Sequence, residues 1–542
     1  MTGIILTDKE LQKTYDIYIK SGGNITATAN ELNIQRSTVQ ARLQRAKKRL
    51  NLEWDRPIVS GTLYGMQKEK RELPSKGRIK TYILTCAQNN THVHTNFWTN
   101  LKAYAKYKHA ELLVSQFSYN KSSYASSKSV KPGTGPTADD KADLWYDKAL
   151  KGHFCNSRVE LAPGLMFCGE VNILPTAERP LQGFETYTKK ACGIFPHTTI
   201  ALESIAGHVP GQTKINYSTG TVTVKNYIQR KAGLKAEFHH TYGALVVEVD
   251  AEGGYWVRQL NATGAGSFYD LDILVSDGEI SIGNEIEAIN WGDVHVENID
   301  PKVLELNWGK NGILNTLKPK FQFMHDTVDF HARNHWRIKD AHAMFERWKM
   351  GVDDVRKEME RVADFLTSTA FRPWCKTVVV DSNHDNALER WLNEADYKAD
   401  PINAIFFLET QLKKYCAMQM RDENFHLVEA VLRELGVKPV IKFLREDESF
   451  IICDDIETGM HGHLGPNGGK GGPLAYARMG RRTNTGHTHS AAILWGAYVA
   501  GTSSKLKLEY NKGPSSWTHS HILTYPNGKR CIITVRNNKW RG

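Results

Sequence analysis

Five short clusters rich in Asp, Asn and His lie between residues 288 and 489, and they constrain the fold more than any other feature of the chain. Several of them stand directly after an apolar, strand-like run, as where residues 377–380 lead into Asp381. The packing of a buried strand does not by itself call for Asn, His and Asp residues at its end. The clusters therefore predict an α/β region whose loops bring polar side chains together, in a set suited to metal ions.

The first two clusters supply carboxylates. Asp293 and His295 are two residues apart, so both point to the same side of an extended strand end and can reach one cation. In the second cluster, Asp326 follows the apolar run 321–324. A carboxylate has two oxygens and can bridge two cations roughly 3.5 to 4 Å apart, as two-metal hydrolysis requires. Asp326 is therefore the candidate bridging residue.

The other three clusters supply an amide and several imidazoles. Glycines beside the histidines let the backbone turn tightly, so that imidazoles from separate loops can converge. The clusters are Asn383-His384-Asp385, His461-Gly462-His463 and Gly486-His487-Thr488-His489. Nitrogen and oxygen ligands without sulfur suit Mn, Fe, Zn or Ni better than copper(I) or an iron–sulfur cluster. We expect two divalent ions, with Mn first and with Fe, Zn, Ni or Mg as alternatives.

In this order the five clusters resemble the calcineurin-like metallophosphoesterase family. The resemblance runs from Asp293 to His489 and implies a β-sandwich flanked by helices. Two positions depart from the family pattern, because His325 and Ser382 stand where the family usually has glycine. Both lie beside expected ligands and neither replaces one.

The resemblance also implies a role for each motif residue. One metal would be held by Asp293, His295 and His489, the other by Asn383, His461 and His487, and Asp326 would bridge the two. His384 would steady the phosphate and protonate the leaving oxygen, and Asp385 would orient the His384 imidazole. His463 and Asp329 would support the ligands from a second layer. Two cations so placed would activate a water for in-line attack on phosphorus.

The N-terminal residues predict a helix-turn-helix-like bundle. Apolar residues recur at helical spacing from Lys9 to Leu50, and a tight turn at Asn33-Ile34 separates a helix over 26–32 from one that starts near Gln35. The last helix is basic and could enter a major groove. The expected DNA-binding residues are Arg36, Ser37, Thr38, Gln40, Arg42 and Arg45. A basic, solvated face on a small bundle is the alternative.

Composition divides the chain into four parts. These are a helix-turn-helix-like domain over 1–65, a charged linker over 66–80, a mixed α/β domain of unknown role over 81–280 and a calcineurin-like domain over 281–542. In the third part, strands are predicted over 82–86, 111–117, 244–249 and 255–260, a helix over 96–110 and a mobile loop over 122–136. Its His92, His94, His239 and His240 lack carboxylate or cysteine partners at a diagnostic spacing, so we expect surface or hydrogen-bonded histidines.

The chemistry of the clusters does not choose a substrate, but the rest of the chain favours DNA. The formal charge is +11, and a basic insertion over 330–372, with Trp336 and Trp348, joins two of the expected ligand loops. The insertion is either a DNA-facing arm or an amphipathic helix pair. Among nucleases of the family, the chain is most similar to phage-encoded early proteins of host DNA degradation and DNA transfer, and more distantly to SbcD-type nucleases.

We therefore predict a metal-dependent DNase that acts in the host cytoplasm. One alternative is a phosphomonoesterase or small-molecule phosphodiesterase whose N-terminal domain serves assembly, and another is a DNA-binding regulator without catalysis. No apolar run approaches the roughly 18 to 20 residues needed to span a bilayer. Association into a homo-oligomer is compatible with the sequence.

Overall fold

The computed structural model describes residues 6–20, 25–50, 68–119, 145–209, 211–335 and 337–542. Its N-terminal part is a three-helix unit of α1 (Asp8–Lys20), α2 (Ile25–Leu32) and α3 (Arg36–Leu50). Asn33 adopts φ 51° in the turn before α3, and Val39 and Leu43 are buried against α1 and α2. The predicted turn between the second and third helices is confirmed.

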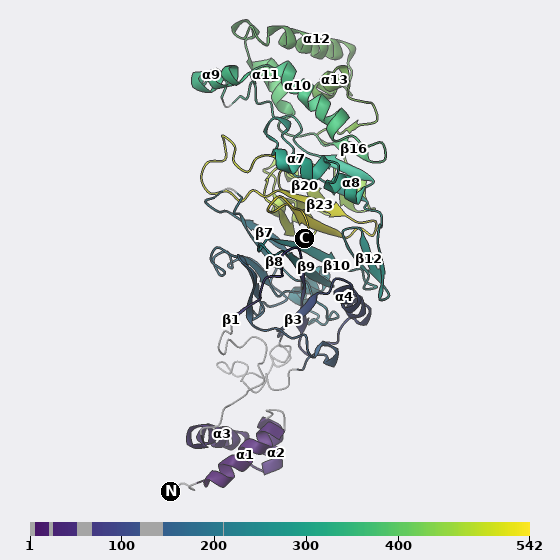
Figure 1. Cartoon of the computed structure of the whole chain (residues 1–542). Helices are drawn as coiled ribbons and strands as arrows, with labels where there is room; N and C mark the ends of the chain where they lie inside the picture. Colours follow the sequence, from purple (N-terminus) through teal and green to yellow (C-terminus); the bar gives the residue numbers. More distant parts are fainter. Residues whose placement is uncertain (1–5, 21–24, 51–67, 120–144, 210, 336) are drawn as a thin grey trace.

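A four-stranded sheet and one helix form the first part of the middle region (Figure 1). The sheet has the order β10-β9-β2-β3, in which β2 and β3 are parallel and β9 is antiparallel to both of its neighbours. Helix α4 packs on one face through Phe97, Leu101 and Tyr104. The predicted elements are confirmed as β2 (Lys80–Gln88), α4 (Thr95–Tyr107), β3 (Glu111–Phe117), β9 (Gly243–Val249) and β10 (Tyr255–Asn261).

An eleven-stranded sheet runs from the middle region into the C-terminal region. Strands β7 and β21 join the two parts, because Leu202 and Glu203 pair with Ile493 and Ala492 in antiparallel register. One ladder therefore crosses residue 280, where composition placed a domain boundary. In sheet order the strands are β1 (Lys68–Lys70), β4 (Arg158–Ala162), β5 (Leu165–Cys168), β6 (Cys192–Phe195), β8 (Lys214–Ser218), β7 (Leu202–Ile205), β21 (Ala492–Leu494), β22 (Ala497–Val499), β20 (Arg482–Thr485), β19 (Ile456–Glu457) and β18 (Ile451–Ile452).

The carboxylate and amide candidates, Asp293, Asp326 and Asn383, follow strands of a six-stranded sheet whose central strands are parallel, whereas His461, His487 and His489 follow β19 and β20 of the eleven-stranded sheet. The side chains of the six-stranded sheet alternate between two cores, as the period of two in a strand requires. Phe323 and Val378 face β18 and β19, whereas Met324 and Val379 face the helices. In sheet order the strands are β17 (Lys442–Phe443), β16 (Lys376–Val379), β15 (Phe321–Met324), β14 (Ala288–Asn290), β23 (Ser520–Thr524) and β24 (Arg530–Thr534).

Helices cover the outer face of this six-stranded sheet (Figure 1). The large apolar core beneath them includes Trp308, Met359 and Trp391. The helices of this region are α7 (Pro301–Trp308), α8 (Ile313–Leu317), α9 (Ala341–Met350), α10 (Val355–Asp364), α11 (Asn386–Glu394), α12 (Ala404–Met420) and α13 (Leu427–Glu434). A sheet between helices on one face and strands on the other gives the region a layered, mixed α/β architecture.

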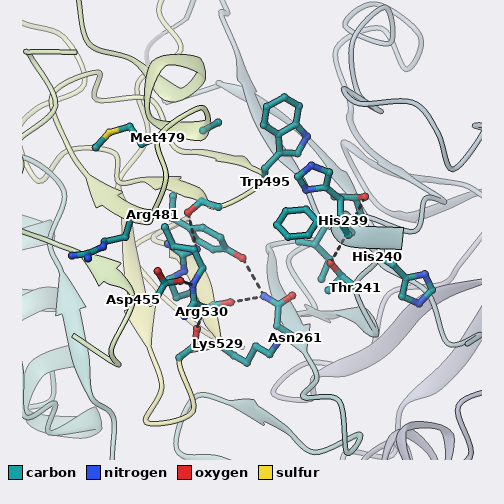
Figure 2. Close-up of a pocket in the computed structure, with 18 of the residues that line it drawn as sticks. His239, His240, Thr241, Asn261, Asp455, Met479, Arg481, Trp495, Lys529 and Arg530 are labelled. Atoms are coloured by element: carbon teal, nitrogen blue, oxygen red, sulfur yellow. Dashed lines mark hydrogen bonds and ion pairs between the residues drawn. The ribbon is translucent and has the colours of Figure 1, made fainter. Parts of the chain in front are cut away.

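The remaining elements are short. They are α6 (Lys231–His239), α14 (Pro473–Ala477), the small sheet of β11 (Phe268–Asp270), β12 (Ile273–Ser276) and β13 (Glu279–Ser281), the 3-10 helices η2 (Lys148–Leu150), η3 (Val296–Asn298), η5 (Tyr397–Ala399) and η6 (Pro466–Gly468), and the π-helix η4 (Phe365–Thr369). Where α6, β20, β22 and the β23–β24 hairpin meet, the structure encloses a cavity of about 410 Å³ (Figure 2). None of the helices in the described ranges is long and apolar enough to cross a membrane.

The structure corrects one expectation and bears on one open alternative in the described residues. Residues 68–70, placed in the linker, form strand β1, which pairs with β4 in parallel register. In the insertion, the basic side chains are largely paired with acids of the chain itself: Arg333 bonds Asp400, and Arg356 bonds Glu409. This pairing favours the amphipathic helix pair over a free cationic arm. Trp336 and the predicted loop over 122–136 lie outside the described residues.

Candidate metal centre

Parallel strands bring the candidate ligands of the first three clusters to one edge of the six-stranded sheet. Strands β14, β15 and β16 are neighbours, with Asn290 opposite Phe323 and Met324 opposite Val379. Asp293 follows the carboxyl end of β14, Asp326 that of β15 and Asn383 that of β16. The carboxyl ends of adjacent parallel strands open on the same crevice, which is the usual ligand site of such sheets. The adjacency of these strands explains why residues 90 positions apart in the sequence meet.

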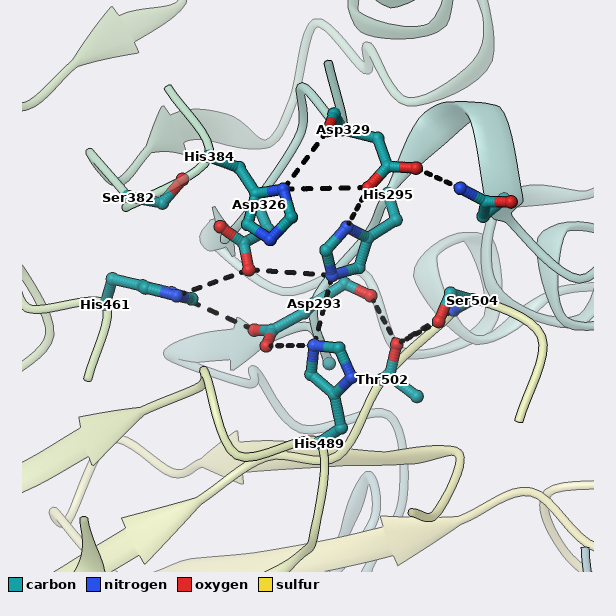
Figure 3. Close-up of polar contacts among 12 residues, drawn as sticks. Asp293, His295, Asp326, Asp329, Ser382, His384, His461, His489, Thr502 and Ser504 are labelled. Carbon is teal, nitrogen blue, oxygen red and sulfur yellow. Dashed lines mark hydrogen bonds and ion pairs between the residues drawn. The ribbon is translucent and has the colours of Figure 1, made fainter. Parts of the chain in front are cut away.

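Four of the seven expected ligands form a tight group (Figure 3). Ligand atoms of Asp293, His295, Asp326 and His489 all lie within 4.8 Å of one another, and all four residues are buried. His489 Nε2 lies 3.0 Å from Asp293 Oδ2, and His295 Nε2 lies 3.5 Å from Asp326 Oδ2. This arrangement has the donor types and the spacing that one divalent ion requires.

His461 and His487 extend the group on the other side of Asp326. His461 Nε2 lies 3.3 Å from Asp326 Oδ2, and its Nδ1 lies 4.0 Å from Asp293 Oδ1. The His487 ring centroid is 5.1 Å from that of His461. Asn383 stands in the loop after β16, next to His384, and its side-chain oxygen is buried. Asp326 Oδ2 therefore lies between the imidazoles of His295 and His461, as an oxygen of a bridging carboxylate would.

Several polar atoms of this group have no hydrogen bond, although the side chains lie close together. Within the described part of the chain, both oxygens of Asp293, one oxygen of Asp326, the Asn383 side-chain oxygen and both ring nitrogens of His461 are buried without a hydrogen-bond partner. Leaving a buried polar group unpaired costs about 1–3 kcal/mol, and more for a charged one. Cations coordinated by these atoms would remove that cost. The donor set therefore fits a metal centre.

Charges within the group shift several pKa values. Burial lowers the pKa of His295, but Asp329, Asp326 and Asp293 together raise it to about 9. Burial would raise the pKa of Asp326, yet His461 and His384 hold it well below its ordinary value. Carboxylates and protonated imidazoles thus compensate one another in the protein alone. Because a histidine must be neutral to bind a metal, metal binding here would release protons.

The backbone at the ligands is strained. His295, Asp326, His487 and His489 adopt positive φ angles of 47°, 48°, 71° and 55°. Such conformations cost non-glycine residues roughly 1–3 kcal/mol each and collect at functional sites, where the surrounding structure enforces them. Gly486 leaves room for the group, since a Cβ there would lie 2.1 Å from Asp293 Oδ1. The strained backbone of these loops thus directs the His295, Asp326, His487 and His489 side chains toward one another.

Asp329, and not Asp385, orients the histidines. Asp329 Oδ1 is 3.1 Å from His295 Nδ1, and the Asp329 backbone oxygen is 3.2 Å from His384 Nδ1. Asp385 instead accepts hydrogen bonds from the backbone and hydroxyl of Ser382, so its predicted contact with His384 is wrong. Ser382, which stands where the family usually has glycine, thus hydrogen-bonds the Asp385 carboxylate. Burial and Asp381 then raise the pKa of Asp385 to about 7.

Aromatic and histidine rings surround the group, and two of them, Trp517 and Tyr510, were not expected from the sequence. The Trp517 ring packs 4.1 Å from that of His489, and Tyr510 packs against Trp517. His325 is fully buried, with its ring 5.6 Å from that of His461. His463, expected in the second layer, lies 3.4 Å from Glu446 and within ring contact of His461. Tyr510 and Trp517 occupy an irregular loop, and no spacing rule connects such a loop to a metal cluster.

The predicted DNA-binding residues lie on or beside α3. Arg36, Ser37, Gln40 and Arg45 are exposed, whereas Thr38 and Arg42 are half-buried. Their placement allows the exposed four to meet a nucleic acid and gives Arg42 a part in packing against the bundle. The middle-region histidines are hydrogen-bonded or stacked, as expected: His94 lies 3.0 Å from the Gly264 oxygen, and His240 lies 2.6 Å from the Tyr227 hydroxyl.

Two comparisons with known proteins find similarities, one to a domain family and one to a whole protein. The chain is a mixed α/β protein with an N-terminal helix-turn-helix domain, and the family described as the PucR C-terminal helix-turn-helix domain matches residues 11–63. Over 476 residues the chain is 39% identical to Protein A1 of Escherichia phage T5, covering 85% of this chain and 83% of that protein. It therefore belongs to the family of phage T5 Protein A1. No solved structure matches the chain.

Proposed function

We propose that this chain is a divalent-metal-dependent DNA phosphodiesterase of the calcineurin-like metallophosphoesterase type. The observation that carries the proposal is the buried group around Asp326, in which several carboxylate and imidazole atoms have no hydrogen bond within the described chain. The layering of the six-stranded sheet between helices and the strands β18 and β19 agrees with a calcineurin-like sandwich.

The residues divide into two metal sites with a shared carboxylate. Asp293, His295 and His489 would hold one ion, Asn383, His461 and His487 the other, and Asp326 would bridge them. Mn²⁺ is the proposed ion, because the ligands are imidazole, carboxylate and amide without sulfur. Two such ions, when bound, lower the pKa of a coordinated water and neutralise phosphate oxygens.

The chain's own side chains would position the phosphodiester and move the proton. His384 stands beside His295, with a ring-centroid distance of 4.8 Å, and reaches the group from the loop after β16. Its Nδ1 faces the Asp329 backbone oxygen, which fixes the ring and leaves Nε2 to carry a proton toward a leaving oxygen. Asp329 Oδ1 also lies 3.1 Å from His295 Nδ1 and 3.6 Å from His384 Nδ1. One carboxylate thus aligns a proposed ligand and the proposed acid.

The proposed substrate is DNA, and the proposed setting is the cytoplasm of a phage-infected host. The helix-turn-helix domain, the net charge of +11 and the phage T5 relative support this choice. The N-terminal domain would raise the local concentration of DNA at the metal centre, since tethering makes the second contact intramolecular.

A cleavage assay tests the proposal and separates its alternatives. Purified protein is given Mn²⁺ with linear DNA, circular DNA or a chromogenic phosphomonoester, and a chelator is added in parallel. We expect chelator-sensitive DNA cleavage. Turnover of the monoester without DNA cleavage would favour a phosphomonoesterase, and no turnover of any substrate would favour a DNA-binding regulator.

The His384→Ala variant tests the assigned acid. We expect it to bind Mn²⁺ as the wild type does and to cleave DNA about 10²- to 10⁴-fold more slowly, the usual contribution of a general acid. His342→Ala, on the exposed side of α9, is the matched control and should keep full activity. Unchanged cleavage in His384→Ala would remove His384 from the mechanism.

A further inference from the structure

A second charged site lies in the cavity at the junction of α6, β20, β22 and the β23–β24 hairpin (Figure 2). Its volume of about 410 Å³ is within the range of small-molecule sites. Arg482 opens β20 at the cavity, whereas His487 and His489 follow the other end of that strand. At about 3.3 Å per residue, a four-residue strand separates the two places by roughly 13 Å. A molecule in the cavity would therefore not be a ligand of the metal centre.

One side of the cavity is cationic and short of acids. Figure 2 shows Lys529 and Arg530 on this side, with the exposed Arg481 side chain directed away from them. Asp455 is the acidic residue among those that line the cavity, and it already pairs with Arg482 at 2.7 Å. Arg530 is buried and donates to neutral oxygens of Thr483, Asn484 and Gly496. In the described ranges, no carboxylate lies within ion-pair distance of Arg481, Lys529 or Arg530.

The pKa values of the cationic side reflect this lack of negative charge. Burial, then Arg482 and Arg530, lower the pKa of the Lys529 ammonium. Burial is also the main cause that lowers the pKa of Arg530 to about 10. Like charges held together at partial burial repel one another, and an anion among them would relieve the repulsion. The cavity is therefore electrostatically suited to a phosphate.

The opposite side of the cavity is aromatic. His239 and Trp495 are stacked, with ring centroids 5.1 Å apart and planes inclined by 22°. The Phe238 ring next to them is 82% exposed. Trp495 adopts φ 52°, and its indole nitrogen donates to the Glu178 backbone oxygen, so its ring is held in place. Flat rings on one side and unpaired cations on the other are the two features that bind a base and its phosphate.

We propose that this cavity binds a nucleotide, with the base extending the Trp495–His239 stack and the phosphate beside Lys529. The nucleotide is either a free deoxynucleoside monophosphate or one unit of a single DNA strand, since both present the same base and phosphate. The site does not depend on the proposed metal chemistry, because none of the metal-centre residues lines it.

Direct binding to the full-length, chelated protein tests the proposal. The probe is dAMP, followed by titration calorimetry, with deoxyadenosine and inorganic phosphate as separate arms. We expect dAMP to bind at least about tenfold more tightly than either part, because base and phosphate both contribute. Inorganic phosphate that binds as tightly as dAMP would overturn the nucleotide assignment.

Variants then locate the binding. Lys529→Gln and Trp495→Asn should each weaken dAMP binding about tenfold, and Asn tolerates the positive φ of Trp495. Lys529→Arg should restore affinity, which separates loss of charge from loss of fold. Lys102→Gln, exposed on α4 and outside the cavity, is the matched control. Equal affinity in Lys529→Gln, Trp495→Asn and the control would overturn the proposal.

A five-nucleotide single strand distinguishes the two sources of the nucleotide. If dAMP binds and is lost in the variants, the site takes a free nucleotide. If only the oligonucleotide binds and is weakened by Lys529→Gln, the site takes a unit of a DNA strand. If neither binds more weakly to the cavity variants than to Lys102→Gln, the proposal fails, whatever the result of the cleavage assay.

Discussion

Two buried groups of charged side chains differ in how completely they are paired. In the middle region, Arg258 donates to Asp270 at 2.6 and 2.8 Å and to Glu248 at 2.8 Å, and Lys108 reaches Glu248 at 2.7 Å. Around Asp326, buried oxygens and ring nitrogens lack partners among the described residues. The charged side chains of the first group pair with one another, whereas several atoms of the second group would find partners only in a bound cation. The number of unpaired atoms, and not the amount of buried charge, separates a structural network from a candidate functional site.

The largest effect should come from removing the proposed bridge. Asp326→Asn takes away the carboxylate shared by both metal sites, so we expect Mn²⁺-dependent cleavage to fall by about a thousandfold or more. Metal content after dialysis should fall with it. In the absence of metal the variant should lose less unfolding free energy than a variant of the paired group, because Asp326 faces the imidazoles of His295 and His461, at 3.5 and 3.3 Å, and not a permanent cation. A strongly destabilised variant would contradict the comparison.

A substitution in the paired group should lower the stability of the fold and leave Mn²⁺ binding unchanged. Arg258→Met leaves Asp270 buried without a cation and Glu248 with Lys108 alone, and breaking such a buried pair costs about 3–5 kcal/mol of unfolding free energy. Urea unfolding measures this loss, with Arg78→Met, at an exposed position, as the control. We expect the folded fraction of the variant to bind Mn²⁺ normally. Unchanged stability would show that the network is dispensable.

Asp329 should have an intermediate effect, because it aligns ligands without being one. Asp329→Asn is expected to weaken metal affinity or cleavage about 10- to 100-fold, as losses of supporting hydrogen bonds to a metal-bound histidine do. Competition with a chelator of known affinity gives the metal affinity. Asp447→Asn, on an exposed loop, should change neither quantity. A Mn²⁺ affinity equal to that of the control would assign no orienting role to Asp329.

The smallest effect concerns a buried histidine that is fully hydrogen-bonded. Burial lowers the pKa of His197 to about 4, and its ring bonds the Leu174 oxygen and the Thr199 amide. The unfolded chain takes up a proton below pH 6.5 but the folded chain does not, so stability present above pH 6.5 is lost as the pH falls toward 4. Between pH 7 and 5 this loss is about 2 kcal/mol.

His197→Gln should remove this part of the pH dependence while it keeps a hydrogen-bonding side chain. Urea unfolding at pH 7 and pH 5 compares the variant with the wild type. Parallel losses of stability in the two proteins would mean that the folded state already protonates His197.

Local patterns in the sequence predicted much of this structure. The turn at Asn33, strands β2, β3, β9 and β10, and the gathering of Asp293, Asp326 and the later histidines all follow from apolar periodicity and polar strand ends. The partner of Asp385 did not follow, because Ser382 competes for that carboxylate at a distance of three residues. The cavity beside Trp495 was also missed, since its walls come from α6 and from strands more than 240 residues later.

The pairing of β7 with β21 limits how this chain can be divided. A fragment that starts at residue 281 would carry the metal-centre residues, but one edge of β21 would have lost its neighbour. Unpaired edges of this kind invite aggregation. The middle region and the C-terminal region therefore share one sheet and have to be produced as one piece.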